Sequence, residues 1–105
     1  SAASDVYKRQ HYASSKGAVV TLTMGVAREF VEHGIRAVSI SPGPIDTAFQ
    51  SISSPQLKQS MTDDIPMKRM GTPQEIGEMV LFIWADACEF MTADTVYING
   101  GGGFR

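Results

Sequence analysis

Tyr12 and Lys16 are the two side chains whose types and spacing point most directly to proton chemistry. They are four residues apart at the start of a segment with a helical pattern, so both lie on one face of a helix. A free phenol has a pKa of about 10 and exchanges protons poorly at neutral pH. A neighbouring ammonium group and the positive end of a helix both favour the phenolate, which would make Tyr12 a general acid or base. The alternative is an exposed helix start with a solvated lysine.

The helix that would carry this pair is predicted from Ala13 to about His33. Two apolar stripes run along it, formed by Val20, Met24, Ala27 and Val31 and by Val19, Leu22, Val26 and Phe30. A helix that is apolar on two sides needs cover on two sides, which we expect from its own sheet and from a partner chain. Gly34 supplies a left-handed stop for this helix.

A buried strand is predicted next, from Ile35 to Ser41, and it ends at Pro42-Gly43-Pro44. The following stretch, residues 45–70, reads as a loop. Within it, Ser54 and Pro55 are suited to begin a short helix that runs to about residue 61.

The last third of the sequence predicts a helix and a short strand. Thr72 and Glu75 form a capping-box pattern with Pro73 between them, and the helix should end near residue 85. Its residues Ile76, Met79, Val80 and Ile83 are expected to face a core. A strand over residues 95–98 and a run of glycines follow.

The order of these elements indicates the α/β class. Short connections between helix and strand favour parallel strands joined by a right-handed crossover. Two parallel strands cannot cover both faces of a sheet or satisfy both of its edges. We therefore expect an incomplete domain, the C-terminal part of a Rossmann-type doubly wound parallel sheet whose other strands precede residue 1.

Four short motifs occur in a characteristic order: Tyr-Ala-Ser-Ser-Lys-Gly-Ala at 12–18, Ser-Pro-Gly-Pro-Ile-Asp-Thr at 41–47, Gly-Thr-Pro-Gln-Glu-Ile at 71–76 and Ile-Asn-Gly-Gly at 98–101. In this order they resemble the C-terminal portion of the short-chain dehydrogenase/reductase family, especially members similar to 3-oxoacyl-[acyl-carrier-protein] reductases. The resemblance implies a Rossmann-type fold that binds NAD or NADP. It covers the segment from about residue 11 onward, so residues 11–105 are expected to be family domain and residues 1–10 a leader foreign to it.

The resemblance also implies roles for the first motif. Tyr12 would protonate the carbonyl oxygen as hydride arrives from the nicotinamide, and Lys16 would lower the pKa of Tyr12 and hydrogen-bond the nicotinamide ribose. Both residues would thus contact the cofactor as well as act in catalysis. The serine of the family's catalytic set would fall before residue 1, and neither Ser1 nor Ser4 lies at the required distance.

The second motif would hold the cofactor. Pro42 and Gly43 would close the strand end beside the nicotinamide, the backbone of Ile45 would hold the carboxamide, and the Thr47 hydroxyl would reach the phosphates. This agrees with the rule that open α/β sheets bind ligands past the carboxyl ends of their strands. Residues 48–67 would match the family's substrate lid. Its apolar side chains Phe49, Ile52, Leu57 and Met61 would line a pocket or form the underside of the lid.

Composition excludes several other kinds of protein. Nine Lys and Arg against eleven Asp and Glu leave a net charge of -2, which argues against a nucleic-acid partner. The longest apolar run, residues 79–85, is far shorter than a membrane span. Cys88 is the single cysteine, and His11 and His33 lack metal-ligand spacing, so no disulfide and no metal site are expected. A cytoplasmic protein fits these features best.

The leading hypothesis is that the parent protein is an NAD(P)-dependent dehydrogenase or reductase acting on a small carbonyl or secondary alcohol, and that it forms a homodimer or homotetramer. Sugar or polyol dehydrogenation is the nearest competitor, and epimerisation or dehydration is a third reaction type. A different possibility is an inactive fragment or oligomerisation module. This chain lacks the glycine-rich turn that binds the pyrophosphate, so by itself it is expected to be inactive.

Overall fold

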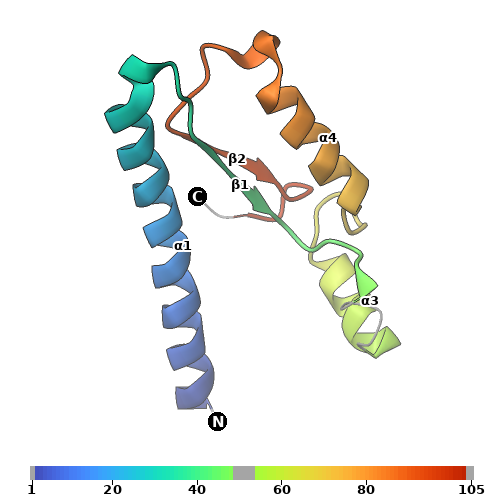
Figure 1. The fold of residues 1–105 in the computed structure, drawn as a ribbon. Helices are drawn as coiled ribbons and strands as arrows, with labels where there is room; N and C mark the ends of the chain where they lie inside the picture. Colours follow the sequence, from blue (N-terminus) through green and yellow to red (C-terminus); the bar gives the residue numbers. More distant parts are fainter. Residues whose placement is uncertain (1, 49–53, 104–105) are drawn as a thin grey trace. The chain divides into compact units, whose positions relative to one another are not determined.

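The computed structural model of the chain describes residues 2–48 and 54–103. In chain order it contains α1 (Ala2–Phe30), the 3-10 helix η1 (Val31–His33), β1 (Val38–Pro42), α3 (Pro55–Asp63), α4 (Pro73–Trp84), the 3-10 helix η2 (Asp86–Cys88) and β2 (Asp94–Ile98) (Figure 1). The chain forms two compact units, Ser1–Ser39 with Phe90–Thr95 and Ile40–Glu89 with Val96–Arg105. Each unit is described by itself below.

Helix α1 is longer than the sequence predicts, because it begins at Ala2 and not at Ala13. No glycine or proline interrupts residues 2–12, so nothing in the local sequence stops the helix there. Tyr12 consequently lies more than two turns inside the helix. The macrodipole acts within the first turn, so the expected help of a helix end for the Tyr12 phenolate is wrong.

The end of this helical segment agrees with the prediction. Gly34 has a φ of 75° and caps η1, and its N–H donates to the Val31 carbonyl. Of the two predicted apolar stripes, Ala27 is buried, whereas Leu22 and Val31 are 66% and 50% exposed. The stripes are therefore largely open apolar surface in this chain, and their cover by a partner chain stays a prediction.

The two strands form one two-stranded sheet in the order β1-β2 (Figure 1). In the first unit the Ala93 N–H donates to the Ala37 carbonyl at 2.8 Å, and in the second the Gly43 N–H donates to the Ile98 carbonyl at 2.8 Å. The residue numbers of the paired positions increase in the same direction along both strands, which is the parallel arrangement that the sequence predicts. Strand β1 begins at Val38, three residues later than expected, and β2 begins at Asp94, one residue earlier.

The helices of the second unit begin as their sequences predict. Ser54 caps α3 by accepting a hydrogen bond from the Leu57 N–H, and Thr72 and Glu75 form the capping box of α4. Cys88 is buried, together with Ile65 and Met70. By contrast, Val80 was expected to face a core but is 42% exposed; α4 has no fully buried residue.

No helix within residues 2–48 and 54–103 combines the length and the apolar character needed to cross a membrane.

Candidate functional site

The loop that leaves β1 starts with a close backbone approach at Gly43. A Cβ at this position would lie 2.8 Å from both the Cα and the Cβ of Asn99. Its N–H is committed to the Ile98 carbonyl, so the loop and the end of β2 are held together at this point. A residue with a side chain would have to push the two backbones apart. Pro42-Gly43 is therefore a tight exit from the strand, as the sequence predicts.

The next residues of the loop are hydrogen-bonded to Gly71, which lies just before α4. The Gly71 N–H donates to the Pro44 carbonyl at 3.0 Å, and the Asp46 N–H donates to the Gly71 carbonyl at 2.8 Å. These two bonds form an isolated parallel bridge between Ile45 and Gly71. In an extended segment successive peptide groups point to opposite sides, so the N–H and C=O of Ile45 itself point away from Gly71. The Ile45 N–H donor and C=O acceptor thus lie side by side. A carboxamide, which has one acceptor and two donor hydrogens, can bind to such a pair.

Asp46 links the same loop to α3. Its carboxylate accepts a hydrogen bond from the Lys58 ammonium at 3.1 Å. Both side chains are more than a third exposed, so this ion pair adds little stability and serves mainly to orient the loop. Thr47 follows and is exposed, with its hydroxyl at the end of the described loop. No local sequence pattern predicts the Asp46–Lys58 contact, because the two residues belong to different elements.

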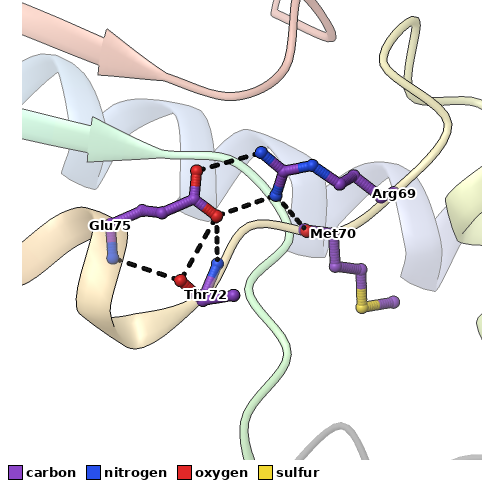
Figure 2. A network of polar contacts seen from close by, with 4 residues as sticks. All are labelled: Arg69, Met70, Thr72 and Glu75. Atoms are coloured by element: carbon purple, nitrogen blue, oxygen red, sulfur yellow. Dashed lines mark hydrogen bonds and ion pairs between the residues drawn. The ribbon is translucent and has the colours of Figure 1, made fainter.

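Four residues that flank Gly71 in the sequence form a polar network, shown in Figure 2: Arg69, Met70, Thr72 and Glu75. The Arg69 guanidinium donates to both carboxylate oxygens of Glu75, at 2.7 and 3.0 Å, and to the Met70 carbonyl at 3.1 Å. Glu75 Oε1 also accepts from the Thr72 N–H and hydroxyl, each at 3.2 Å. One carboxylate therefore fixes the residues on both sides of Gly71. Sequence reasoning found the capping box but missed Arg69, which follows no helical spacing to Glu75.

This network has a pH dependence. The hydrogen bond from Arg69 lowers the pKa of Glu75 from 4.5 to about 2, with smaller contributions from the Thr72 amide, the charge of Arg69 and the Thr72 hydroxyl, and burial opposes them. Because the pKa is depressed in the folded state, the stabilisation is present above about pH 4.5 and is lost as the pH falls toward 2.

We therefore expect the free energy of unfolding to decline over this pH range, and the decline to be smaller in Glu75→Gln. Urea unfolding followed by circular dichroism at a series of pH values measures it. Glu78→Gln, an exposed position on the same helix, is the control. Equal slopes for Glu75→Gln and the unaltered chain would contradict the assignment.

A cavity of about 430 Å³ lies in the second unit beside this network. Its lining includes Pro44, Ile65, Ile76, Tyr97 and Asn99 together with the Arg69–Glu75 pair. Most of the named lining side chains are apolar, and the two charged ones, Arg69 and Glu75, are paired with each other. The cavity wall is therefore mainly apolar with polar groups at a few points. No pattern in the sequence predicts this cavity.

Tyr12 and Lys16 lie one helical turn apart on α1, as expected. The side chain of Tyr12 is outside the described part of the structure, and Lys16 is exposed. Both belong to the first unit, and Pro42, Gly43, Ile45 and Thr47 belong to the second. The structure thus assembles the predicted loop with Gly71 and Asn99.

The expected lid is described in part. Phe49 and Ile52 lie outside the described residues, and Leu57 on α3 is 53% exposed. His11 and His33 are exposed. Within residues 2–48 and 54–103, no three His, Cys, Asp or Glu side chains are grouped so as to hold a metal ion.

A parallel α/β fragment with a tight loop at the carboxyl end of a strand is typical of open, parallel α/β domains, and comparison with known proteins specifies the family. The family profile described as enoyl-(acyl carrier protein) reductase matches residues 1–102. The chain is 38% identical over 90 residues to an uncharacterised oxidoreductase of Schizosaccharomyces pombe, a match covering 86% of this chain and 32% of that protein. It is 34% identical over 91 residues to the 3-oxoacyl-[acyl-carrier-protein] reductase FabG of Staphylococcus epidermidis, covering 87% of this chain and 37% of that one.

Solved structures give the same result. The crystal structure of the 3-oxoacyl-[acyl-carrier protein] reductase from Brucella melitensis superposes with a TM-score of 0.83 at 31% identity, over 87% of this chain and 34% of that chain. The chain belongs to the short-chain dehydrogenase/reductase family. It is a partial Rossmann-type α/β domain, and it spans about a third of the length of the curated relatives named above.

Proposed function

We propose that the protein containing this chain is an NAD(P)-dependent oxidoreductase that transfers hydride between a nicotinamide and a carbonyl or secondary alcohol. The observation that carries this proposal is the loop after β1. Its bridge to Gly71 turns the N–H and C=O of Ile45 outward at the carboxyl end of a parallel strand. Family membership and the four-residue spacing of Tyr12 and Lys16 support it further.

Each residue of the proposed site has one task. When bound, the nicotinamide supplies or accepts the hydride. Tyr12 donates a proton to the carbonyl oxygen in the reducing direction and takes it back in the oxidising direction, and the Lys16 ammonium stabilises the phenolate that remains. The backbone of Ile45 orients the carboxamide, and the Thr47 hydroxyl donates toward the phosphates.

For the substrate, we favour a ketone on an acyl chain, because two of the named relatives are 3-oxoacyl-[acyl-carrier-protein] reductases. Sugars and polyols are the competing substrates.

The apolar stripes of α1 also suggest assembly into a homodimer or homotetramer, since Leu22 and Val31 are open to solvent in the single chain. If the chain instead serves only as an oligomerisation module, it should assemble but support no turnover in any context.

A chimera tests the proposal, because this chain spans about a third of the length of its relatives. Residues 11–103 replace the matching segment of the Brucella melitensis reductase, and turnover is followed with NADH and NADPH against acyl, sugar and simple ketones. We expect cofactor oxidation that depends on a ketone. A second chimera that keeps residues 1–10 tests whether this segment is foreign to the family domain. If it is foreign, we expect a lower yield of folded protein. A folded chimera that binds cofactor but reduces no ketone would overturn the proposed function.

A further inference from the structure

The loop from Pro42 to Thr47 is attached to the rest of its unit through Gly71. The two hydrogen bonds between Gly71 and the loop, at 3.0 and 2.8 Å, run from a single residue to the carbonyl before Ile45 and the amide after it. The Ile45 side chain also lies against Gly71, because a Cβ on Gly71 would be 2.8 Å from the Ile45 Cδ1. The direction of the Ile45 peptide groups therefore follows the backbone of Gly71 closely.

The backbone of Gly71 is in turn fixed from both sides by one carboxylate. Thr72 donates its N–H to Glu75 Oε1, and Arg69 holds both Glu75 and the Met70 carbonyl (Figure 2). A glycine has more backbone freedom than any other residue, so a segment that depends on Gly71 needs such external support. The Arg69 and Glu75 side chains are 55% and 40% exposed, so their attraction alone adds little stability. Their bidentate geometry and the bonds to Thr72 and Met70 give the support a defined direction.

We propose that Arg69 and Glu75 are positioning residues, which act through Gly71 to hold the Ile45 backbone in the orientation that receives the cofactor. The inference rests on the proposed function for what the loop binds, but the mechanical link from Glu75 to the loop stands on the contacts alone. A separate contact, the exposed Asp46–Lys58 ion pair, restrains the Asp46 side chain independently of Glu75. Losing Glu75 therefore frees the bridge while leaving this second restraint in place.

Amide hydrogen exchange in the 105-residue chain, resolved by NMR, tests the link. In the unaltered chain we expect slowed exchange at the Gly71 and Asp46 amides. Glu75→Gln should accelerate both by about tenfold or more, since it removes a charged partner of several hydrogen bonds. The Gly43 amide, bonded to Ile98, should change much less. Arg69→Lys keeps one contact to the carboxylate and should give a smaller acceleration than Glu75→Gln.

Glu78→Gln on the same helix is the matched control, and it should leave all three amides as they are. The inference is overturned if Gly71 and Asp46 show no slowed exchange in the unaltered chain. It is also overturned if Glu75→Gln behaves as Glu78→Gln does, or if it accelerates Gly43 as much as Gly71, because the last result would mean a general loss of stability.

A kinetic measurement in the chimera separates this inference from the proposed function. Glu75→Gln should raise the KM for the cofactor about fivefold or more and leave kcat within about twofold, because the Arg69–Glu75 pair orients the loop and takes no part in proton transfer. If the chimera turns over and both constants stay unchanged, the positioning role is wrong. If the chimera does not turn over at all, the proposed function fails, and the exchange experiment still decides whether Glu75 holds the loop.

Discussion

Replacing Tyr12 by phenylalanine should abolish most of the ketone reduction by the chimera, lowering kcat about 10²- to 10⁴-fold. The substitution removes one hydroxyl and keeps the ring, so the helix at this position should be unaffected. In the proposed site this hydroxyl is the group that gives its proton to the carbonyl oxygen, so its removal should stop the step. The KM for the cofactor should change far less than kcat, because the proposed carboxamide contacts come from the loop after β1.

Two further variants show whether the loss is specific. Thr21→Val also removes one hydroxyl, at an exposed position of α1, and should keep activity within about twofold. Lys16→Met should also reduce kcat, because the phenolate loses the neighbouring positive charge. Tyr12→Phe activity close to that of Thr21→Val would show that Tyr12 is an ordinary helix residue, which is the alternative that the spacing alone left open.

Gly43→Ala should destabilise the 105-residue chain by about 1–3 kcal/mol, as expected for overpacking at a close contact. The added Cβ would lie 2.8 Å from the Cα of Asn99, and backbone cannot move aside as a flexible side chain can. The 2.8 Å hydrogen bond from Gly43 to Ile98 would lengthen in consequence. Urea unfolding followed by circular dichroism measures the change in the free energy of unfolding.

Gly77→Ala is the matched control for this experiment. Gly77 lies within α4, and nothing stands within 4 Å of the Cβ that alanine would add. Because alanine favours a helix over glycine, this variant should be more stable by about 0.4–1 kcal/mol. The two glycine substitutions thus have opposite predicted signs. A Gly43→Ala chain as stable as Gly77→Ala would mean that the loop and Asn99 do not approach each other as described.

Local signals in the sequence predicted the elements well where a side chain acts on its own backbone. The capping box of Thr72 and Glu75, the Ser54 cap and the left-handed Gly34 are interactions within a few residues, so they can be read without knowing the fold. The parallel pairing of the two strands followed from the short connections between helix and strand. The start of α1 was missed because residues 2–12 contain no stop signal and no apolar period.

The contacts that shape the candidate site are harder to predict, because they join distant positions. Nothing near Gly43 indicates that Asn99 lies against it, and nothing near Ile45 indicates that Gly71 will pair with it. Arg69 reaches Glu75 across the turn before α4, outside the spacings that a helix imposes. Four ordered motifs predict where the site lies, and only the structure shows how its loop is held.

Deuterium transfer tests the central claim most directly. The chimera is incubated with a nicotinamide cofactor that carries deuterium at the transferable position and with a ketone, and the alcohol is analysed by mass spectrometry. Direct hydride transfer predicts one deuterium on the carbinol carbon of each alcohol formed, and very little product in Tyr12→Phe. Alcohol without deuterium would mean that the hydride comes from another donor, and a product formed without net oxidation of the cofactor would indicate epimerisation or dehydration. Either result would contradict the account.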